Sequence, residues 1–285
     1  MIPLKRPLMR YYGGKWRIAD WIISYFPEHR VYQELFGGAA SVLLQKKPAQ
    51  VEIYNNLNDE VVNLFRVLRN EAQCQKLISL LHLTPYSRME LSECEKPAVD
   101  PVERARRTIV LTCFSFNASK ALKRKANTFR TNSTGHHKQA ISFQESTYNL
   151  WIIAARLKEV IIENKHWKKL FNQHDFEDTL TYADPPYLES SRSQKGNHYV
   201  NEMGSLEAHA ELADSLKSAK GMVIISHYDC PEYDELYTQC GWEIHTKKAR
   251  TGAATTGKSV AMESIWLNPA AADAQRQLKL NYNLT

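Results

Sequence analysis

Short apolar runs alternate with stretches of helical periodicity along most of the chain. The runs are rich in β-branched and aromatic residues, which predicts buried strands. One predicted strand begins at Val31, and the others lie at 51–54, 159–164, 179–183, 222–226 and 263–267. Apolar residues at helical spacing predict helices at 18–25, 39–44, 61–68, 151–158, 168–178 and 206–218. This alternation predicts an α/β domain built on a mainly parallel sheet.

The alternation is interrupted between residues 70 and 165. Heptad-like helical runs at 74–82 and 102–113 come first, and a basic segment rich in Asn, Ser and Thr follows at 117–142. Aromatic residues are interleaved with the charges, namely Phe114, Phe116, Phe129, Phe143 and Tyr148. They suit contacts with bases as well as a small local core, and the core is the commoner role. We interpret the stretch as an insertion between the early and the late strands.

Positive charge is concentrated in this insertion. From Arg104 to Gln144 the chain has nine Lys and Arg residues and no Asp or Glu, whereas the remainder has 28 basic and 31 acidic residues. Such a local excess is expected of a surface that contacts nucleic-acid phosphates. The alternative is a basic face that only keeps the protein in solution.

The composition is globular and excludes several classes of protein. The 285 residues are 43% hydrophobic and 24% charged, and no apolar run approaches the roughly 18 residues of a membrane span. The N-terminus lacks the apolar segment of a secretory signal. The five cysteines form no C-x-x-C pair, which favours reduced thiols in a cytoplasm and disfavours a structural zinc site.

The tetrapeptide Asp184-Pro185-Pro186-Tyr187 directly follows the predicted strand 179–183. The Asp184 carboxylate and the Pro185 carbonyl can accept both N–H groups of a planar amine, and the prolines fix φ near −65° without adding donors. This suits the N6 amine of adenine, whose lone pair is delocalised into the ring. Tyr187 can stack on a base turned out of its duplex. The alternative, from the tetrapeptide alone, is a proline turn with Asp184 as a helix cap.

Two glycine turns lie beside predicted elements. The turn 11–15 ends in Lys15, which we place in the first turn of the following helix. A lysine there is unfavourable beside the positive end of the helix dipole unless an anionic or carbonyl partner offsets it, which favours contact with a ligand over a plain solvent lysine. The turn 34–38 follows the first strand, where α/β domains bind ligands and glycines permit close approach. After the second strand, Asn58 or Asp59 is either a helix N-cap or a ligand of a ribose.

Two further features remain open at this level. His209 and His227 lack the spacing of metal ligands, so we interpret them as ordinary polar residues and predict no metal site. The small, polar segment 249–261 is either a flexible linker or a hairpin loop that contacts DNA.

In this order, the motifs Tyr-Gly-Gly-Lys, Glu-Leu-Phe-Gly-Gly-Ala, Asn-Leu-Asn-Asp and Asp-Pro-Pro-Tyr resemble those of Dam-like DNA adenine methyltransferases, particularly phage and prophage members. The resemblance covers nearly the whole chain. It implies a Rossmann-like methyltransferase sheet formed by 1–69 and 155–285, with an inserted, mainly helical target-recognition domain at 70–154. Only the last tetrapeptide is specific by itself.

The resemblance also implies roles for individual residues. Asp184, Pro185, Pro186 and Tyr187 would hold the flipped adenine, and metal would not be required. The expected ligands of S-adenosylmethionine are Tyr11, Lys15, Glu34, Phe36, Gly37, Gly38, Asn56 and Asp184. From the basic charge of the insertion, the expected contacts with double-stranded DNA are Lys120, Lys123, Arg124, Lys125, Arg130 and Lys138. We expect a monomer in solution, with a dimer on DNA as the alternative, and a restriction-modification or other phage-related role in the cytoplasm.

Asn56 departs from the family pattern, which commonly has Asp there to hold the ribose. Asn keeps an acceptor oxygen but loses the charge, and a hydrogen bond to a charged group is worth about 1.5–3 against 0.5–1.5 kcal/mol. We therefore expect weaker cofactor binding, and Asn56→Asp to tighten it. The alternative function is a DNA-binding protein of this fold with weak or no turnover. Cytosine-N4 methylation is disfavoured because related enzymes usually have Ser in the place of Asp184, and charge alone leaves RNA open as a substrate.

Overall fold

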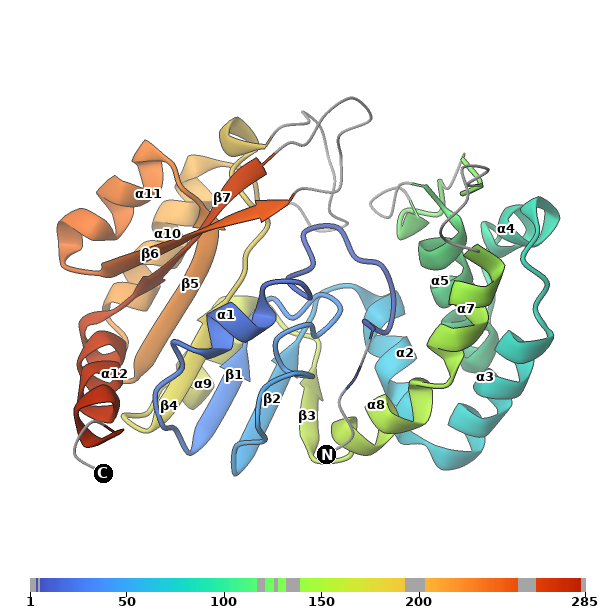
Figure 1. Cartoon of the computed structure of the whole chain (residues 1–285), viewed down its shortest axis with the longest axis horizontal. Coiled ribbons are helices and arrows are strands. Elements are labelled where there is room, and N and C mark those ends of the chain that lie inside the picture. Colours follow the sequence, from blue (N-terminus) through green and yellow to red (C-terminus); the bar gives the residue numbers. More distant parts are fainter. Residues whose placement is uncertain are drawn as a thin grey trace.

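The computed structural model describes residues 4, 6–116, 121–125, 128–131, 139–192, 203–250 and 260–282. Within this part of the chain, seven strands form one sheet in the order β3-β2-β1-β4-β5-β7-β6 (Figure 1). The parallel strands are β1 Val31–Glu34, β2 Val51–Asn55, β3 Val160–Glu163, β4 Thr179–Ala183 and β5 Met222–Tyr228. The antiparallel strands are β6 Glu243–Arg250 and β7 Val260–Leu267. The predicted α/β class is confirmed.

Helices cover both faces of the sheet because strand residues alternate between the faces. Val31, Ile53 and Val223 face one hydrophobic cluster, which they share with α9 Trp167–His174, α10 Leu206–Lys217 and α11 Pro231–Leu236. The other face carries Tyr32, Tyr54 and Tyr182, in a second cluster with α2 Asp59–Arg69 and α12 Pro269–Tyr282. A short helix, α1 Ala19–Ile23, contributes to the same cluster.

The inserted helices extend the second cluster and stand beside α2 (Figure 1). They are α3 Glu71–Leu83, α4 Arg88–Cys94, α5 Pro101–Phe114, α7 Gln139–Thr147 and α8 Leu150–Leu157. Leu77, Ile109 and Ile153 belong to the same cluster as the α2 residues Leu64 and Phe65. One continuous core therefore joins the insertion to the sheet, and a boundary at residue 70 stays a prediction.

Capping side chains explain where the helices of this region begin. The Asn58 side chain accepts a hydrogen bond from the backbone N–H of Glu60, and Asn70 does the same for Gln73. Asp100 caps α5, whose first residue is Pro101. Asn, Asp and Ser are preferred at this position because they satisfy otherwise unpaired N–H groups, and proline is favoured at the first helical position.

Two expectations about the local structure were wrong. The predicted helix 39–44 is a series of turns, because Gly38 and Ala40 have φ values of 51° and 56° that an α-helix does not accept. Lys15 also lies before α1 rather than in its first turn. Strand β6 was not predicted, since its sequence EIHTKKAR is largely polar, and neither were α4, α7, α11 and α12.

Candidate active site

A cavity of about 560 Å³ opens at the carboxyl ends of β1, β2 and β4. Strands β1 and β4 are neighbours, but the chain continues from β1 to one side of the sheet and from β4 to the other. Ligands of such sheets bind where the strand order reverses in this way. The cavity wall contains Tyr11, Lys15, Glu34, Phe36, Gly37, Gly38, Asn56, Asp184 and Pro186, nine of the residues singled out from the sequence. Pro185 and Tyr187 lie beside it.

Asp184 and Lys15 form an ion pair in the wall of this cavity. The Lys15 Nζ lies 2.9 Å from Asp184 Oδ1, and the two side chains are 5% and 16% exposed. Lys15 also donates to the Gly13 carbonyl at 2.9 Å. Burial opposes the charge of Lys15, but Asp184 and Glu263 together raise its pKa above the ordinary value. Lys15 thus has the anionic and carbonyl partners that the sequence led us to expect, and they come from the chain itself.

The pKa of the Asp184 carboxyl group lies above its ordinary value, mainly because the group is buried. Lys15 lowers it in turn through its charge and its contact with Oδ1, and Ser226 lowers it through a hydrogen bond. A buried carboxylate with several donors has a fixed orientation, which is what holding an amine requires.

The backbone after Asp184 is held from behind by two side chains. His209 on α10 donates from Nε2 to the Pro186 carbonyl at 3.0 Å, since its Nδ1 accepts from the Tyr233 hydroxyl at 2.7 Å. Arg192 donates from Nε to the Tyr187 carbonyl at 2.7 Å. Burial lowers the pKa of His209 to about 4, so the ring is neutral near pH 7. These contacts fix the path of the proline pair.

His227 on β5 completes this support. The backbone N–H of Leu188 donates to His227 Nε2 at 2.9 Å, so the ring proton is on Nδ1, which donates to the Tyr228 carbonyl at 2.8 Å. Burial lowers the pKa of His227 well below its ordinary value. His209 and His227 are therefore not surface residues. Within the described residues no group of His, Cys, Asp and Glu could hold a metal ion.

Tyr187 lies under Lys15 rather than facing open space. Its hydroxyl donates to Glu263 Oε2 at 2.8 Å, and its ring centroid lies 4.6 Å from the Lys15 Nζ and 4.4 Å from the His227 ring. Only 5% of the residue is exposed. For the predicted stacking on a base, the Lys15 side chain would have to shift, and this role stays a prediction. Sequence reasoning had missed Glu263, which is 76 residues away along the chain.

The glycines of the second turn are required by two tyrosine rings. A Cβ atom at Gly37 would lie 2.1 Å from Tyr54 Cε2, and one at Gly38 would lie 2.9 Å from Tyr11 Cε1. Neither distance is compatible with a side chain at that position. The turn thus needs glycine for the packing of the chain itself, and a close approach to the cofactor is a separate prediction.

Asn56 uses its side chain within the cavity wall. Its Oδ1 accepts from the Asn58 N–H at 2.8 Å, and its Nδ2 donates to the Gly38 carbonyl at 3.2 Å and to the Tyr54 hydroxyl at 3.0 Å. The residue is 8% exposed. Its amide therefore ties the end of β2 to the glycine turn.

Glu34 is a second acidic residue in the wall. It is 2% exposed, and its Oε2 accepts from the Tyr32 hydroxyl at 2.9 Å and from the Leu43 N–H at 3.1 Å. Burial raises the pKa of Glu34 to about 8, so the carboxyl group is mainly protonated at neutral pH. Glu34 is therefore mainly uncharged at neutral pH, and Asn56 carries no charge. The acidic group of the wall that pairs with Lys15 is Asp184, at 2.9 Å.

Several arginines of the insertion form ion pairs with acidic residues. Arg124 lies 2.9 Å from Glu60 and donates to the Cys94 and Lys96 carbonyls. Arg104 pairs with Glu60 at 3.4 Å, and Arg106 and Arg107 each pair with Glu103 at 2.7 Å. The local charge excess in the sequence therefore overstates the charge that is free for phosphates, because part of it is neutralised by residues outside the segment.

The other predicted DNA contacts differ in their placement. Lys125 is exposed and Lys123 is half-buried with an interaction of its own, whereas Lys120 and Lys138 lie outside the described residues. Arg130 is half-buried, and its backbone N–H donates to the Phe114 carbonyl at 2.7 Å. Phe114 and Phe143 are buried in the core, as is common for such aromatics. Phe116, by contrast, is 59% exposed.

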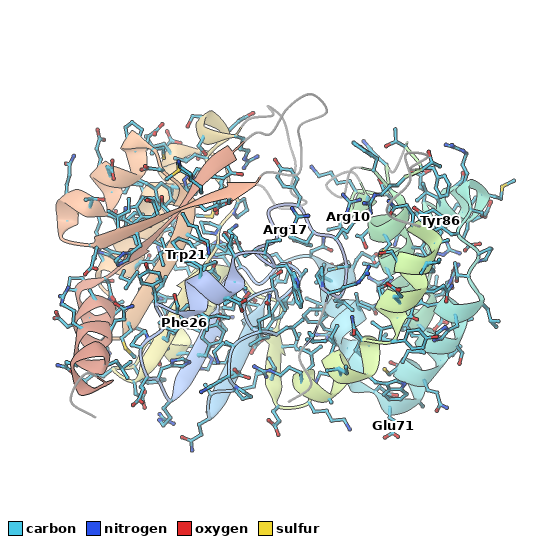
Figure 2. All side chains as sticks on the ribbon, in the orientation of Figure 1. Arg10, Arg17, Trp21, Phe26, Glu71 and Tyr86 are labelled. Atoms are coloured by element: carbon cyan, nitrogen blue, oxygen red, sulfur yellow. The ribbon has the colours of Figure 1, made fainter. Side chains whose placement is uncertain are left out.

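The N-terminal segment contacts the insertion directly. Arg10 donates from Nη1 to the Ser115 carbonyl at 2.8 Å, and Figure 2 shows it reaching from the N-terminal trace toward the end of α5. The sequence did not indicate this contact, because 105 residues separate the two partners. The turn that carries Lys15 and the insertion are thus linked through Arg10.

The end of the β6–β7 hairpin at Arg250 and Val260 and the upper end of α5 both lie toward the top of the view in Figure 1. The strands pair from Glu243 and Leu267 to Arg250 and Val260, so both ends of the segment 249–261 lie in paired strands. Its central residues, 251–259, lie outside the described residues, so both interpretations, a flexible linker and a loop that contacts DNA, stay predictions.

Comparisons with known proteins agree with this geometry. The family model of the D12 class N6 adenine-specific DNA methyltransferases matches residues 11–252. A DNA adenine methylase of Haemophilus influenzae is 25% identical over 243 residues, 81% of this chain and 82% of that protein. One of Vibrio cholerae is 23% identical over 262 residues, covering 89% and 91%. A DNA N-6-adenine-methyltransferase of Escherichia phage P1 is 22% identical over 271 residues, 89% of this chain and 34% of that protein.

Proposed function

Because the chain belongs to the D12 class of N6 adenine-specific DNA methyltransferases, we propose that it transfers a methyl group from S-adenosylmethionine to the N6 amine of an adenine turned out of duplex DNA. The observation that carries this proposal is the position of Asp184, at the carboxyl end of β4 and in the wall of the cavity. The backbone of residues 186–188, just after it, is held by His209, Arg192 and His227.

The cavity fits the cofactor in size and chemistry. Its volume of about 560 Å³ lies within the range of roughly 300–1,000 Å³ found for small-molecule sites. Phe36 and Trp167 supply apolar rings, and Asn56 and the glycine turn supply polar groups. S-adenosylmethionine, when bound, supplies a methyl group on a sulfonium that moves to nitrogen by direct displacement without a metal.

The residues of the chain orient the amine for this displacement. Asp184 and the Pro185 carbonyl would accept its two N–H hydrogens, which raises the electron density on nitrogen and aims its lone pair. Asp184 is also placed to take the proton that the methylated amine releases, and its raised pKa favours that transfer. Held in this way, the amine needs no further activation by the protein.

Several finer statements belong to the same proposal. Arg130, Lys123 and Lys125 would contact DNA phosphates, and we propose a monomer in solution that acts in the cytoplasm, where its DNA substrate lies. Among the described helices, none has the length and apolar character needed to cross a membrane.

Transfer of tritium from labelled S-adenosylmethionine to duplex DNA tests the proposal. The wild-type chain should label DNA, and nucleoside analysis should recover the label as N6-methyladenine. Asp184→Ala should bind DNA and leave it unlabelled. Binding without transfer by the wild-type chain would instead support the alternative, a DNA-binding protein with little or no turnover.

A further inference from the structure

Ser226 lies directly behind the carboxylate of Asp184. It follows Ile225, which pairs with Ala183 in the parallel ladder between β5 and β4, so the two strands bring Ser226 and Asp184 side by side. The residue is 1% exposed. No motif in the sequence drew attention to it, because Ser226 and Asp184 are 42 residues apart.

The hydroxyl of Ser226 joins two groups of the site. Its Oγ lies 3.0 Å from Asp184 Oδ1 and 2.9 Å from the Tyr182 hydroxyl. The Ser226 hydroxyl has two acceptors, Asp184 Oδ1 at 3.0 Å and the Ala183 carbonyl at 3.5 Å. The nearer one is Asp184, so Ser226 donates to the carboxylate and the Tyr182 hydroxyl donates to Ser226. The result is a series of two buried hydrogen bonds, one from Tyr182 to Ser226 and one from Ser226 to Asp184.

The contacts of Asp184 Oδ1 restrict the rotation of this carboxylate. Asp184 Oδ1 accepts from both Ser226 and Lys15, at 3.0 and 2.9 Å. A turn about the Cβ–Cγ bond would break both contacts, so Oδ2 keeps one direction. Lys15 alone restrains it less, because an ammonium on a four-carbon stem is a mobile point charge.

We propose that Ser226 is a positioning residue for methyl transfer, which fixes the plane of the Asp184 carboxylate that accepts the target amine. This inference rests on the proposed function and names a residue that acts through Asp184 without touching the substrate. Methyl transfer is sensitive to such positioning, since misplacement of a reacting group by about 1 Å can cost a hundredfold in rate.

The chain offers a matched control in Ser264 on β7. Ser264 is fully buried like Ser226, but its Oγ has no hydrogen-bond partner among the described residues. Removing either hydroxyl takes away one buried oxygen from the central strands, and only Ser226→Ala removes a contact with Asp184. Loss of a buried hydroxyl as such would affect both variants alike, and Ser226→Ala additionally removes the contacts with Asp184 and Tyr182.

The test compares Ser226→Ala, Ser226→Thr and Ser264→Ala in steady-state methyl transfer. Ser226→Ala should lower kcat about tenfold, because a hydrogen bond to a charged group is lost, and leave KM for cofactor and DNA unchanged. Ser226→Thr, which keeps the hydroxyl, should recover most of the rate, and Ser264→Ala should equal wild type. Thermal unfolding of each variant verifies that it is folded.

The pH dependence of kcat/KM distinguishes a positioning role from a structural one, because a purely structural role of Ser226 would leave the acid limb at the same pH. The hydrogen bond from Ser226 lowers the pKa of Asp184, so in Ser226→Ala the acid limb of kcat/KM should shift to higher pH. Tyr182 loses its contact with Ser226 in this variant, and its own pKa is raised well above the ordinary value by burial, so it does not titrate in the acid limb. The other titratable groups facing Asp184 keep their contacts, namely Lys15, Glu34, Tyr11, Tyr187, Tyr228, Tyr233 and Glu263.

The outcomes separate this inference from the proposed function. If wild type transfers label and Ser226→Ala has the same kcat and pH profile, or Ser264→Ala loses as much activity, the role of Ser226 is refuted while the proposed function stands. If wild type itself transfers no label, both are overturned.

Discussion

The carboxyl edge of the sheet and the inserted helices both contain paired charges, but the pairs face different surroundings. At the edge, Lys15 and Asp184 meet inside a cavity, and the carboxylate belongs to the strand end where a ligand is expected. Around the insertion, Arg106 on α5 meets Glu90 on α4, and Arg124 meets Glu60 on α2. The first pair lines the cavity, whereas the others join neighbouring elements of the fold. A count of charges along the sequence cannot distinguish these two uses.

The largest expected effect concerns the buried histidine behind the tetrapeptide. His209 has a pKa of about 4 in the folded protein against 6.5 in the unfolded chain, so the unfolded chain binds a proton that the folded one does not as the pH falls below 6.5. The free energy of unfolding should therefore drop between pH 7.5 and 5, by about 2 kcal/mol from this residue.

Urea unfolding at both pH values measures this loss. His209→Gln, which can still donate to the Pro186 carbonyl, should show a smaller drop than wild type. His82→Gln is the control, because His82 is exposed. Equal pH dependence in wild type and His209→Gln would show that the edge is not held by a neutral histidine.

The next effect tests the packing of the glycine turn. Gly37→Ala should lower the free energy of unfolding by about 1–3 kcal/mol, since its Cβ would lie 2.1 Å from the Tyr54 ring. Gly241→Ala isolates backbone strain, because Gly241 has φ 84° and no atom lies within 4 Å of its added Cβ. Gly37→Ala combined with Tyr54→Leu should regain part of the stability. A Gly37→Ala variant as stable as wild type would contradict the packing seen here.

Substitution of two adjacent basic residues of the insertion should affect different properties, stability for Arg124 and DNA binding for Lys125. Arg124→Ala should cost about 1 kcal/mol of stability, because it removes the ion pair with Glu60 and two contacts with carbonyls. Lys125→Ala should leave stability unchanged, weaken DNA binding for all sequences and reduce the salt slope by about 1. Urea unfolding and DNA titrations at several salt concentrations measure both. If Arg124→Ala changes only the DNA affinity, the contrast between the two regions fails.

The smallest effect is expected at Asn56. Asn56→Asp should tighten cofactor binding through a charged acceptor, but it also replaces the amide that donates to the Gly38 carbonyl and the Tyr54 hydroxyl. We therefore expect only a severalfold gain in affinity by calorimetry, with a lower melting temperature. Unchanged cofactor affinity in Asn56→Asp would contradict the hypothesis that Asn56 contacts the ribose of the cofactor.

The parallel strands were predictable because each is a short apolar run between polar turns. Strand β4 was predicted with its observed bounds, and the site motif follows it directly. Strand β6 was not predictable in this way, since an edge strand with one solvated face has a polar sequence. The helix expected after Gly38 failed because sequence does not reveal that Ala40 adopts a positive φ.

The site residues also divide into those that the sequence predicts and those that it does not. Asp184, Lys15 and the glycine turns were found because they form local motifs, and the fold brings them to one cavity. Ser226, His209 and Glu263 were missed because they act on the tetrapeptide from 42, 23 and 76 residues away. His209 and Glu263 became recognisable only through their burial and their partners, which the register of strands and helices decides.

The central claim is that Asp184 holds an adenine amine for methylation, and the modification pattern of cellular DNA tests it most directly. Long-read sequencing of DNA from cells that express the wild-type chain should show N6-methyladenine in a defined sequence context. DNA from cells that express Asp184→Ala at the same level should lack it. The same adenine modification with both chains, or a modified base other than adenine with wild type, would contradict the account.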